Sequence, residues 1–293
     1  MAQILVNGVS VGALYALLAL SFWVIFAVTR TFHLAHVIVL TYAAYTLYWV
    51  LGPASLPLWL AVPAAGGVAV ALGVAIEAWV YQPIRRRGGS QLILFVASSA
   101  LLIIGQAVLA LVFEEYGHGI EQDVPPPVLQ TAQAVVTRYD VLNVLFAVTA
   151  SVVVWALLRH HRWGHALRAV QGNAELAGYF GLDVARIFRI SFGLGSLLLL
   201  PPVVVMALRT GVHPELGFTP VLVAIVAVIT GGTESQAGAM LAGFLLGCLE
   251  NVALLWVGAH WQPMITFLVL FVVLLWRPRG LRAAVEVRTT PTH

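Results

Sequence analysis

Nine apolar runs follow one another along this chain, and they restrict its possible folds more than any other feature. They lie at residues 4–28, 33–51, 56–81, 92–113, 141–158, 188–208, 219–230, 237–257 and 262–276. Most reach the roughly 18 or more residues that an α-helix needs to cross a bilayer. Hydrophobic residues occupy 61% of the 293 positions and charged residues 9%, which leaves too little polar cover for a soluble domain. We therefore predict an all-α, polytopic transmembrane helical bundle.

Two of the nine runs are irregular. The run 33–51 opens with two histidines, and the run 219–230 has only about half of the twenty residues that a full crossing requires. We expect about eight or nine spans, with one or two broken or short helices, in a single transmembrane domain over residues 1–293. The apolar first run lacks a basic leader, so we interpret it as a retained span and not as a signal peptide.

The arginines predict the orientation of the chain. If Arg30, residues 82–91, residues 159–189 and the tail after 276 share one side, thirteen of the fifteen arginines lie there and only Arg138 and Arg209 lie opposite. The positive-inside rule makes the arginine-rich side cytoplasmic. We therefore expect a bacterial inner-membrane protein with its N-terminus outside, its C-terminus inside and a periplasmic loop over 114–140.

Two residue types limit the chemistry. The chain has no lysine, which excludes a P-loop lysine, a Schiff-base lysine or a lysine general base. Its single cysteine, Cys248, lies in an apolar run, so cysteine supplies neither a disulfide framework nor a metal cluster. We expect no cofactor, no metal and no nucleic-acid partner for this chain.

A polar interval, Arg159–Arg189, interrupts the apolar pattern and contains signals for a short helix. Asn173 is a good N-cap, Glu175 lies in the first turn, and Gly181 supplies a stop. The helix, at about Ala174–Phe180, would be roughly 10 Å long. It is too short to span a bilayer and too well capped for an irregular loop.

The apolar face of this short helix has two interpretations. Leu176, Tyr179 and Phe180 would lie together on it. Such a face suits docking into a groove of a partner protein. It suits equally a helix that lies on the lipid interface, helped by Arg168 and Trp163.

A glycine-rich break, TGGTESQAG at Thr230–Gly238, separates two apolar runs. Transport sites often lie where short or glycine-broken helices meet near the bilayer midplane. Glu234 is the notable residue here, because an acid at midplane costs about 2.5–3.5 kcal/mol on insertion scales. It would then face water, solute or a cation. Alternatively the turn reaches the cytoplasmic surface, where Glu234 is merely solvated.

A second break, RTFHLAHV at Arg30–Val37, contains His33 and His36. A helix would place both rings on one face. Two imidazoles without a third ligand make a poor zinc site, so a solute-facing pair and ordinary helix packing remain as alternatives. Of the acids at membrane depth, we expect Glu77 and Glu250 to form structural pairs with arginines.

Several segments, in the same order along nearly the whole chain, resemble bacterial ABC-importer permeases of the branched-chain amino acid type, and of these the H-type subunit. The segments are NGVSVGALYALLALSFWVIF at 7–26, IEAWVYQPIRRR at 76–87, SSALLIIGQ at 98–106, GHALRAVQGNAELAGYFGLDVARI at 164–187, AVITGGTESQAGAMLAGFLLGCLENV at 227–252 and LLWRPRGL at 274–281. The resemblance implies a permease subunit that moves a small solute by alternating access.

The resemblance also implies how such a subunit is driven. The loop 159–189 would be the cytoplasmic coupling element, inserting its short helix into a separate ATPase subunit that holds the ATP and Mg²⁺. The coupling residues would be Asn173, Ala174, Glu175, Leu176, Ala177, Tyr179, Phe180 and Gly181. The pathway residues would be His33, His36, Gln106, Gly231, Gly232 and Glu234.

The remaining implied partners are a second permease, identical or homologous, membrane lipid and a periplasmic solute-binding protein that docks on the outer loops. Residues His33, Leu34, Val37, Thr233 and Glu234 depart from the family pattern. They leave the solute open between branched-chain amino acids, urea and short amides. The alternative function is a self-sufficient secondary transporter or channel that uses intramembrane Glu and His. A membrane enzyme would need a nucleophile–base pair or metal set, which no span offers.

Overall fold

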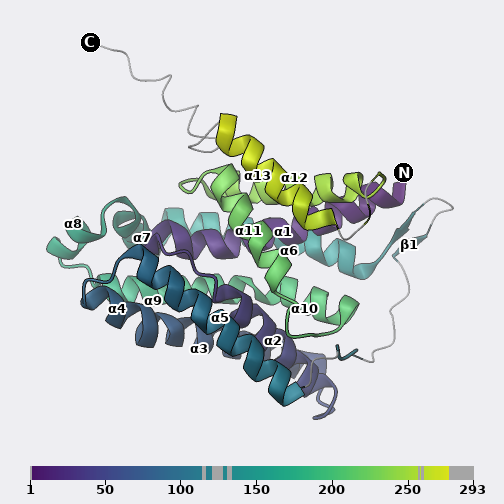
Figure 1. Ribbon diagram of the computed structural model, residues 1–293, viewed down its shortest axis with the longest axis horizontal. Helices are drawn as coiled ribbons and strands as arrows, with labels where there is room; N and C mark the ends of the chain where they lie inside the picture. Colours follow the sequence, from purple (N-terminus) through teal and green to yellow (C-terminus); the bar gives the residue numbers. More distant parts are fainter. Residues whose placement is uncertain are drawn as a thin grey trace. The chain divides into compact units, whose positions relative to one another are not determined.

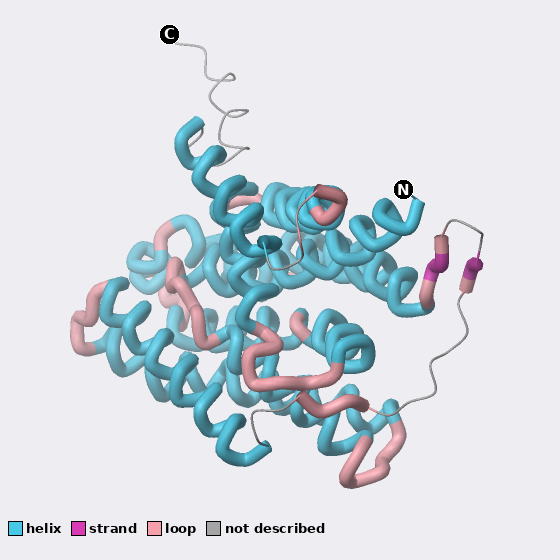
Figure 2. Tube along the Cα trace, turned by 45° about the vertical axis from the view of Figure 1, so that its right-hand side comes forward, coloured by secondary structure: helices cyan, strands magenta, loops and turns pink. Residues whose placement is uncertain are grey.

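The computed structural model describes residues 2–113, 117–120, 128–130, 134–256, 258 and 261–276. These residues are helical almost throughout (Figures 1 and 2). The elements are α1 (Ala2–Thr29), α2 (His36–Leu51), α3 (Leu58–Ile76), the π-helix η1 (Glu77–Tyr81), α4 (Gln82–Arg86), α5 (Gln91–Phe113), β1 (Leu129–Gln130), β2 (Val135–Val136), α6 (Arg138–His160), α7 (Arg162–Gly172), α8 (Ala174–Tyr179), α9 (Val184–Leu198), α10 (Leu200–Thr210), α11 (Phe218–Gly231), α12 (Gln236–Ala253) and α13 (Gln262–Trp276). The two strands pair antiparallel, Leu129 with Val136 and Gln130 with Val135.

The all-α membrane class is confirmed, whereas the predicted count of eight or nine spans is not. Among the described residues, six helical stretches are long and apolar enough to cross a membrane: Ala2–Thr29, Leu58–Arg86, Gln91–Phe113, Arg138–His160, Val184–Thr210 and Gln236–Ala253. Helices α2 and α11 are apolar but shorter. The 14 residues of α11 measure about 21 Å at 1.5 Å per residue, so this run is short as predicted.

The chain divides into two compact units. Unit 1 contains residues 1–23, 125–151 and 222–293, and unit 2 contains residues 24–124 and 152–221. The boundaries therefore fall inside α1, α6 and α11. A single permease domain over 1–293 stays a prediction.

Unit 1 is held together by close backbone contact between α1 and α12. A Cβ atom on Gly243 would lie 2.7 Å from the carbonyl oxygen of Tyr15, and one on Gly247 would lie 2.5 Å from the Cα of Gly12. Any larger residue would force the two helices apart. Small residues at these positions let the helices approach as in other membrane bundles.

Unit 2 is built on the stretch α3–η1–α4, against which α2 and α9 both pack. Gly73 of α3 meets Ser196 and Phe192 of α9. At the far end of α9, a core of Val28, Leu167, Val170, Ala177, Ile187 and Phe188 joins it to α7 and α8. The same unit therefore contains the polar interval and the His33–His36 break.

Candidate functional sites at two helix breaks and a capped surface helix

Three side-chain caps organise the polar interval. At the start of α7, His161 Nδ1 accepts a hydrogen bond from the Trp163 amide at 3.2 Å. At the start of α8, Asn173 Oδ1 accepts from the Leu176 amide at 2.9 Å. Asp183 Oδ1 accepts from the Arg186 amide at 3.0 Å and begins α9. Each cap satisfies a helix N–H group that would otherwise have no partner, so the interval is a defined structure.

Helix α8 confirms the predicted short capped helix, although its last helical residue is Tyr179 and not Phe180. Gly181 ends it with a φ of +84°, the left-handed conformation that glycine adopts without strain. Ala177 is buried in the core shared with α7 and α9. The opposite face is exposed: Tyr179 is 80% and Phe180 82% accessible.

The break before α2, residues Arg30–Ala35, differs from the prediction in one respect. His33 lies in a turn that precedes the helix, closed by a hydrogen bond from the His36 amide to its carbonyl. The prediction that a helix places both rings on one face was therefore wrong. The chain leaves α1 at Arg30, whose φ of 53° is not helical. The two rings still meet, with centroids 5.3 Å apart, because the turn folds His33 back over His36.

A hydrogen-bonded network fixes this break from the side. Tyr81 donates to Ser98 Oγ at 2.8 Å, and the Ala35 amide donates to the same oxygen at 2.8 Å. His33 Nδ1 lies 2.8 Å from the Tyr81 oxygen. Since the Tyr81 proton goes to Ser98, we assign the proton on this bond to His33 Nδ1. Nε2 of His33 is then an acceptor, and it is buried without a hydrogen-bond partner among the described residues.

The π-helix places a buried acid beside this network. Glu77 begins η1 and pairs with Arg85, whose side chain also donates to Thr31 Oγ1 at 3.4 Å. The Arg85 guanidinium lies 4.6 Å above the Phe188 ring of α9. The predicted arginine partner for Glu77 is thus confirmed. π-Helical turns are frequent at functional sites.

Glu250 does not follow the same prediction. Within the part of the chain that the structure describes, its partners are the hydroxyls of Thr266 and Tyr15, not an arginine. All three residues belong to unit 1, and all three side chains are buried there. A hydroxyl pair satisfies a buried carboxyl without a second charge.

The break between α11 and α12 is built from backbone. Gly231 and Gly238 lie in direct contact: a Cβ on Gly231 would lie 2.6 Å from the Ala239 nitrogen. Gly232 follows with a φ of +101°. Ser235 Oγ then accepts from the Gly238 amide at 3.0 Å and begins α12. The turn is therefore set by steric fit.

The polar residues around this turn differ in exposure. Trp23 Nε1 donates to the Thr233 carbonyl at 3.0 Å, and Glu234 is exposed. An exposed carboxylate fits the solvated alternative for Glu234, whose role stays a prediction.

Gln106 of α5 is half-buried, and its role also stays a prediction. The structure brings His33 and His36 together in unit 2, while Gly231, Gly232 and Glu234 lie in unit 1.

Sequence reasoning missed two residues that bind the first break together, Tyr81 and Ser98. Each is a hydroxyl inside a long apolar run, which is an indication of an internal hydrogen bond in membrane helices. Their partners lie 48 and 63 positions away in the sequence. A local pattern therefore indicates that a bond exists but not to which residue.

Interrupted apolar helices, one of them broken around buried imidazoles, are features of membrane transport proteins. Comparison with known proteins gives the particular family. Residues 4–274 match the model of the branched-chain amino acid transport system permease component. The chain belongs to this family, and it is a multi-pass inner-membrane permease subunit of the ABC-transporter class. This confirms the resemblance and supports the permease function over the self-sufficient alternative.

Individual relatives match over nearly their whole length. The chain is 29% identical to the high-affinity branched-chain amino acid transport system permease protein BraD of Pseudomonas aeruginosa, covering 97% of this chain and 96% of that protein. It is 27% identical to the corresponding protein LivH of Escherichia coli K12, with the same coverage. The ribose import permease protein RbsC of E. coli matches a smaller part, 41% of this chain at 30% identity.

The fold also occurs in a solved structure, PsaBC from Streptococcus pneumoniae in complex with Fab. The match has a TM-score of 0.52 at 11% identity and covers 96% of this chain and 94% of that one. At this identity the likeness concerns the fold alone.

Proposed function

We propose that this chain forms the membrane pathway of an importer for branched-chain amino acids or similar small solutes. It works by alternating access, and separate subunits hydrolyse the ATP. The observation that carries the proposal is α8, a capped helix that is anchored in the core of unit 2 by Ala177 while it displays Tyr179 and Phe180 to solvent. Two adjacent exposed aromatics on a fixed helix suit insertion into a groove of a partner.

A force on α8 has a direct route to α9. Ala177 of α8 shares its core with Ile187 and Phe188 of α9. The segment between the two helices is tied to α8, because the Leu182 amide donates a hydrogen bond to the Ala177 carbonyl at 3.1 Å. Packed cores move as bodies and do not deform continuously, so α8 and α9 move together.

Helix α9 in turn contacts the first break. Phe188 lies under the Arg85 guanidinium. Phe192, one turn further, has its ring centroid 4.8 Å from that of His33 and 5.6 Å from that of Tyr81. A shift of α9 would therefore press on the side chains that hold the break. We infer that this is how ATP-driven movement reaches the solute pathway.

The proposal includes the subunits that surround the chain. The ATPase subunits, with ATP and Mg²⁺ bound, would lie under α8 on the cytoplasmic side, with the N-terminus of this chain outside and its C-terminus inside. A second permease, identical or homologous, would complete the pathway. A periplasmic binding protein would deliver the solute to the loops at 114–140 and 209–219. This chain would perform no reaction itself.

The solute class follows from the relatives and from the break. BraD and LivH are named for branched-chain amino acids. The buried acceptor at His33 Nε2 would suit an N–H donor, which amino acids, amides and urea all carry. We propose that His33, His36, Gln106 and the 231–234 turn contact the solute on its way through.

The test is reconstitution of the purified chain in liposomes, with and without its permease, ATPase and binding-protein partners. Labelled leucine is offered, with isoleucine, valine, urea and acetamide as competitors. The complex should accumulate leucine only when ATP is enclosed with the ATPase, and the chain alone should accumulate none. Uptake by the chain alone, driven by a proton gradient, would contradict the proposal. Leucine uptake that urea or acetamide suppresses, and that isoleucine and valine do not, would assign the pathway to small amides and not to branched-chain amino acids; it would leave the mechanism intact.

A further inference from the structure

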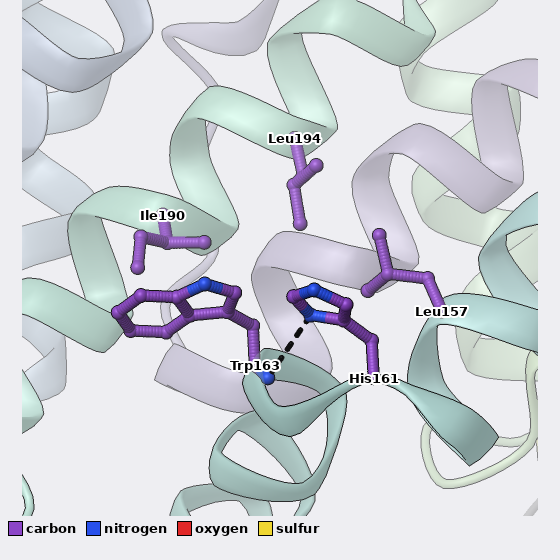
Figure 3. Close-up of a pocket in the computed structure, with 5 residues that line it drawn as sticks. All are labelled: Leu157, His161, Trp163, Ile190 and Leu194. Atoms are coloured by element: carbon purple, nitrogen blue, oxygen red, sulfur yellow. Dashed lines mark hydrogen bonds between the residues drawn. The ribbon is translucent and has the colours of Figure 1, made fainter.

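An apolar groove lies beside the polar interval, between α6, α7 and α9. It has a volume of about 340 Å³ and is lined by Leu157, His161, Trp163, Ile190 and Leu194. Figure 3 shows Ile190 and Leu194 extending from α9 towards the Trp163 indole and the His161 imidazole, with Leu157 on the other side of the imidazole. The lining offers a long hydrocarbon surface that ends at an indole.

The edge of the groove carries positive charge. The guanidinium carbons of Arg186 and Arg162 lie 5.1 Å and 5.5 Å from the centre of the Trp163 ring. Both arginines are exposed. Between residues 155 and 190 the sequence has only two acids, Glu175 and Asp183, and Asp183 is the cap of α9. The groove therefore ends in a cationic rim.

The wall of the groove formed by α6 belongs to an unusually uncovered helix. Only 17% of the apolar stretch of α6 is buried inside the protein, which is the lowest share among the six long helices of the described residues. Trp155, two residues before Leu157, is half exposed and lies beneath Arg159 at 5.3 Å. Tryptophan and arginine together are typical of the level where hydrocarbon meets headgroups. A groove beside this pair suits the level where hydrocarbon meets the headgroups.

We propose that this groove binds one anionic glycerophospholipid. Its acyl chain lies along Ile190 and Leu194, and its phosphate and anionic headgroup lie between Arg162 and Arg186. Guanidinium groups bind phosphate oxygens through paired, charge-assisted hydrogen bonds, and basic pockets between membrane helices on the cytoplasmic side select anionic headgroups. A zwitterionic choline lipid would bring a third cation to this rim. The lipid would join α7 to α9 and so support the base of α8; the binding itself does not depend on the proposed function.

Native mass spectrometry of the full-length chain in detergent tests the site. The chain is titrated with phosphatidylglycerol, with phosphatidylcholine of the same acyl chains, and with soluble glycerol phosphate. We expect one tightly retained phosphatidylglycerol, no comparable retention of phosphatidylcholine, and none of glycerol phosphate. The double variant Arg162→Gln, Arg186→Gln should bind phosphatidylglycerol about thirtyfold more weakly, since it removes both guanidinium groups that would hold the phosphate.

Two further variants separate charge from shape. Arg86→Gln with Arg87→Gln removes the same number of exposed charges from α4 and its C-cap, away from the groove, and should leave binding within about twofold. Leu194→Trp keeps every charge but fills the groove, and it should abolish the retained lipid. Equal retention of both lipids, equal loss in the two charge variants, competition by glycerol phosphate, or a second protein copy holding the groove in place of lipid would each overturn the proposal.

Discussion

The two helix breaks of this permease are held by different means. The break at Arg30–Ala35 is fixed by side chains: Tyr81, Ser98 and His33 form one hydrogen-bonded group around it. The break at Gly231–Ser235 is fixed by backbone, because two glycines lie in contact and Ser235 caps the next helix. Backbone groups inside a membrane must find partners within the protein, and these are two ways to supply them.

The two breaks therefore differ in how they respond to movement and to substitution. Hydrogen bonds between hydroxyls and an imidazole can exchange partners when a neighbouring helix moves, and Phe192 of α9 touches this group directly. A glycine contact has no alternative partner and holds one geometry. We therefore expect the first break to be sensitive to the loss of a polar atom and the second to the gain of a methyl group.

The largest effect is expected at the ion pair beside the first break. Arg85→Gln leaves buried Glu77 without its hydrogen-bonded counter-charge, so that among the described residues only the charge of Arg189 still acts on it. Loss of one partner of a buried pair costs about 3–5 kcal/mol of unfolding free energy. Unfolding of the purified chain in mixed detergent measures it. Glu77→Gln combined with Arg85→Gln should recover most of the loss, because no charge is then stranded. If the double variant is no more stable than Arg85→Gln, the pair is not what holds η1.

The next effect tests the second break. Gly231→Ala places a methyl group against the backbone of Gly238, where nothing can rotate away, and overpacking of this kind costs about 1–3 kcal/mol. The melting temperature of the purified chain should fall by several degrees. Gly67→Ala is the matched control, since an added Cβ there meets nothing within 4 Å. Similar losses in both variants would mean that the glycine contact does not set the turn.

A loss of similar size is expected at the hydrogen bonds of the first break. Ser98→Ala removes the acceptor of both Tyr81 and the Ala35 amide, and buried groups left without partners cost about 1–3 kcal/mol. Ser99→Ala removes an exposed hydroxyl of the same helix, bonded only locally to Phe95, and should change stability by less than about 0.5 kcal/mol. Differential scanning fluorimetry compares the two. If the two variants have equal melting temperatures, the hydrogen bonds of Ser98 do not stabilise the first break.

The smallest effect is expected at the cap of α12. Ser235→Ala removes the oxygen that accepts from the Gly238 amide and should cost about 1 kcal/mol. Ser235→Thr keeps an acceptor at the same place and should recover most of that stability. A Thr variant as unstable as the Ala variant would show that the cap is not the relevant interaction.

Local patterns predicted much of this structure and long-range contacts did not follow from them. Asn173 and Gly181 indicated α8 because caps act on neighbouring residues, and apolar runs located the helices because crossing lengths are fixed by the bilayer. The turn at His33 and the hydroxyl partners of Glu250 could not be predicted. Both depend on contacts with residues that are distant in the sequence, and hydrophobic periodicity does not identify such contacts.

The central claim is that separate subunits drive this permease through α8. The most direct test is ATP-dependent leucine uptake by liposomes containing the complete complex, with the double variant Tyr179→Ala, Phe180→Ala. Exposed aromatic anchors of an interface each contribute about 2 kcal/mol or more, so docking should weaken more than tenfold. The control, Trp59→Ala with Trp79→Ala, removes two equally exposed aromatics from α3 and η1.

We predict that the α8 variant inserts and folds normally, loses the ATPase on copurification and takes up no leucine, while the control transports. Normal ATP-driven uptake by the α8 variant, in a complex that still retains its ATPase, would show that α8 does not couple ATP hydrolysis to transport.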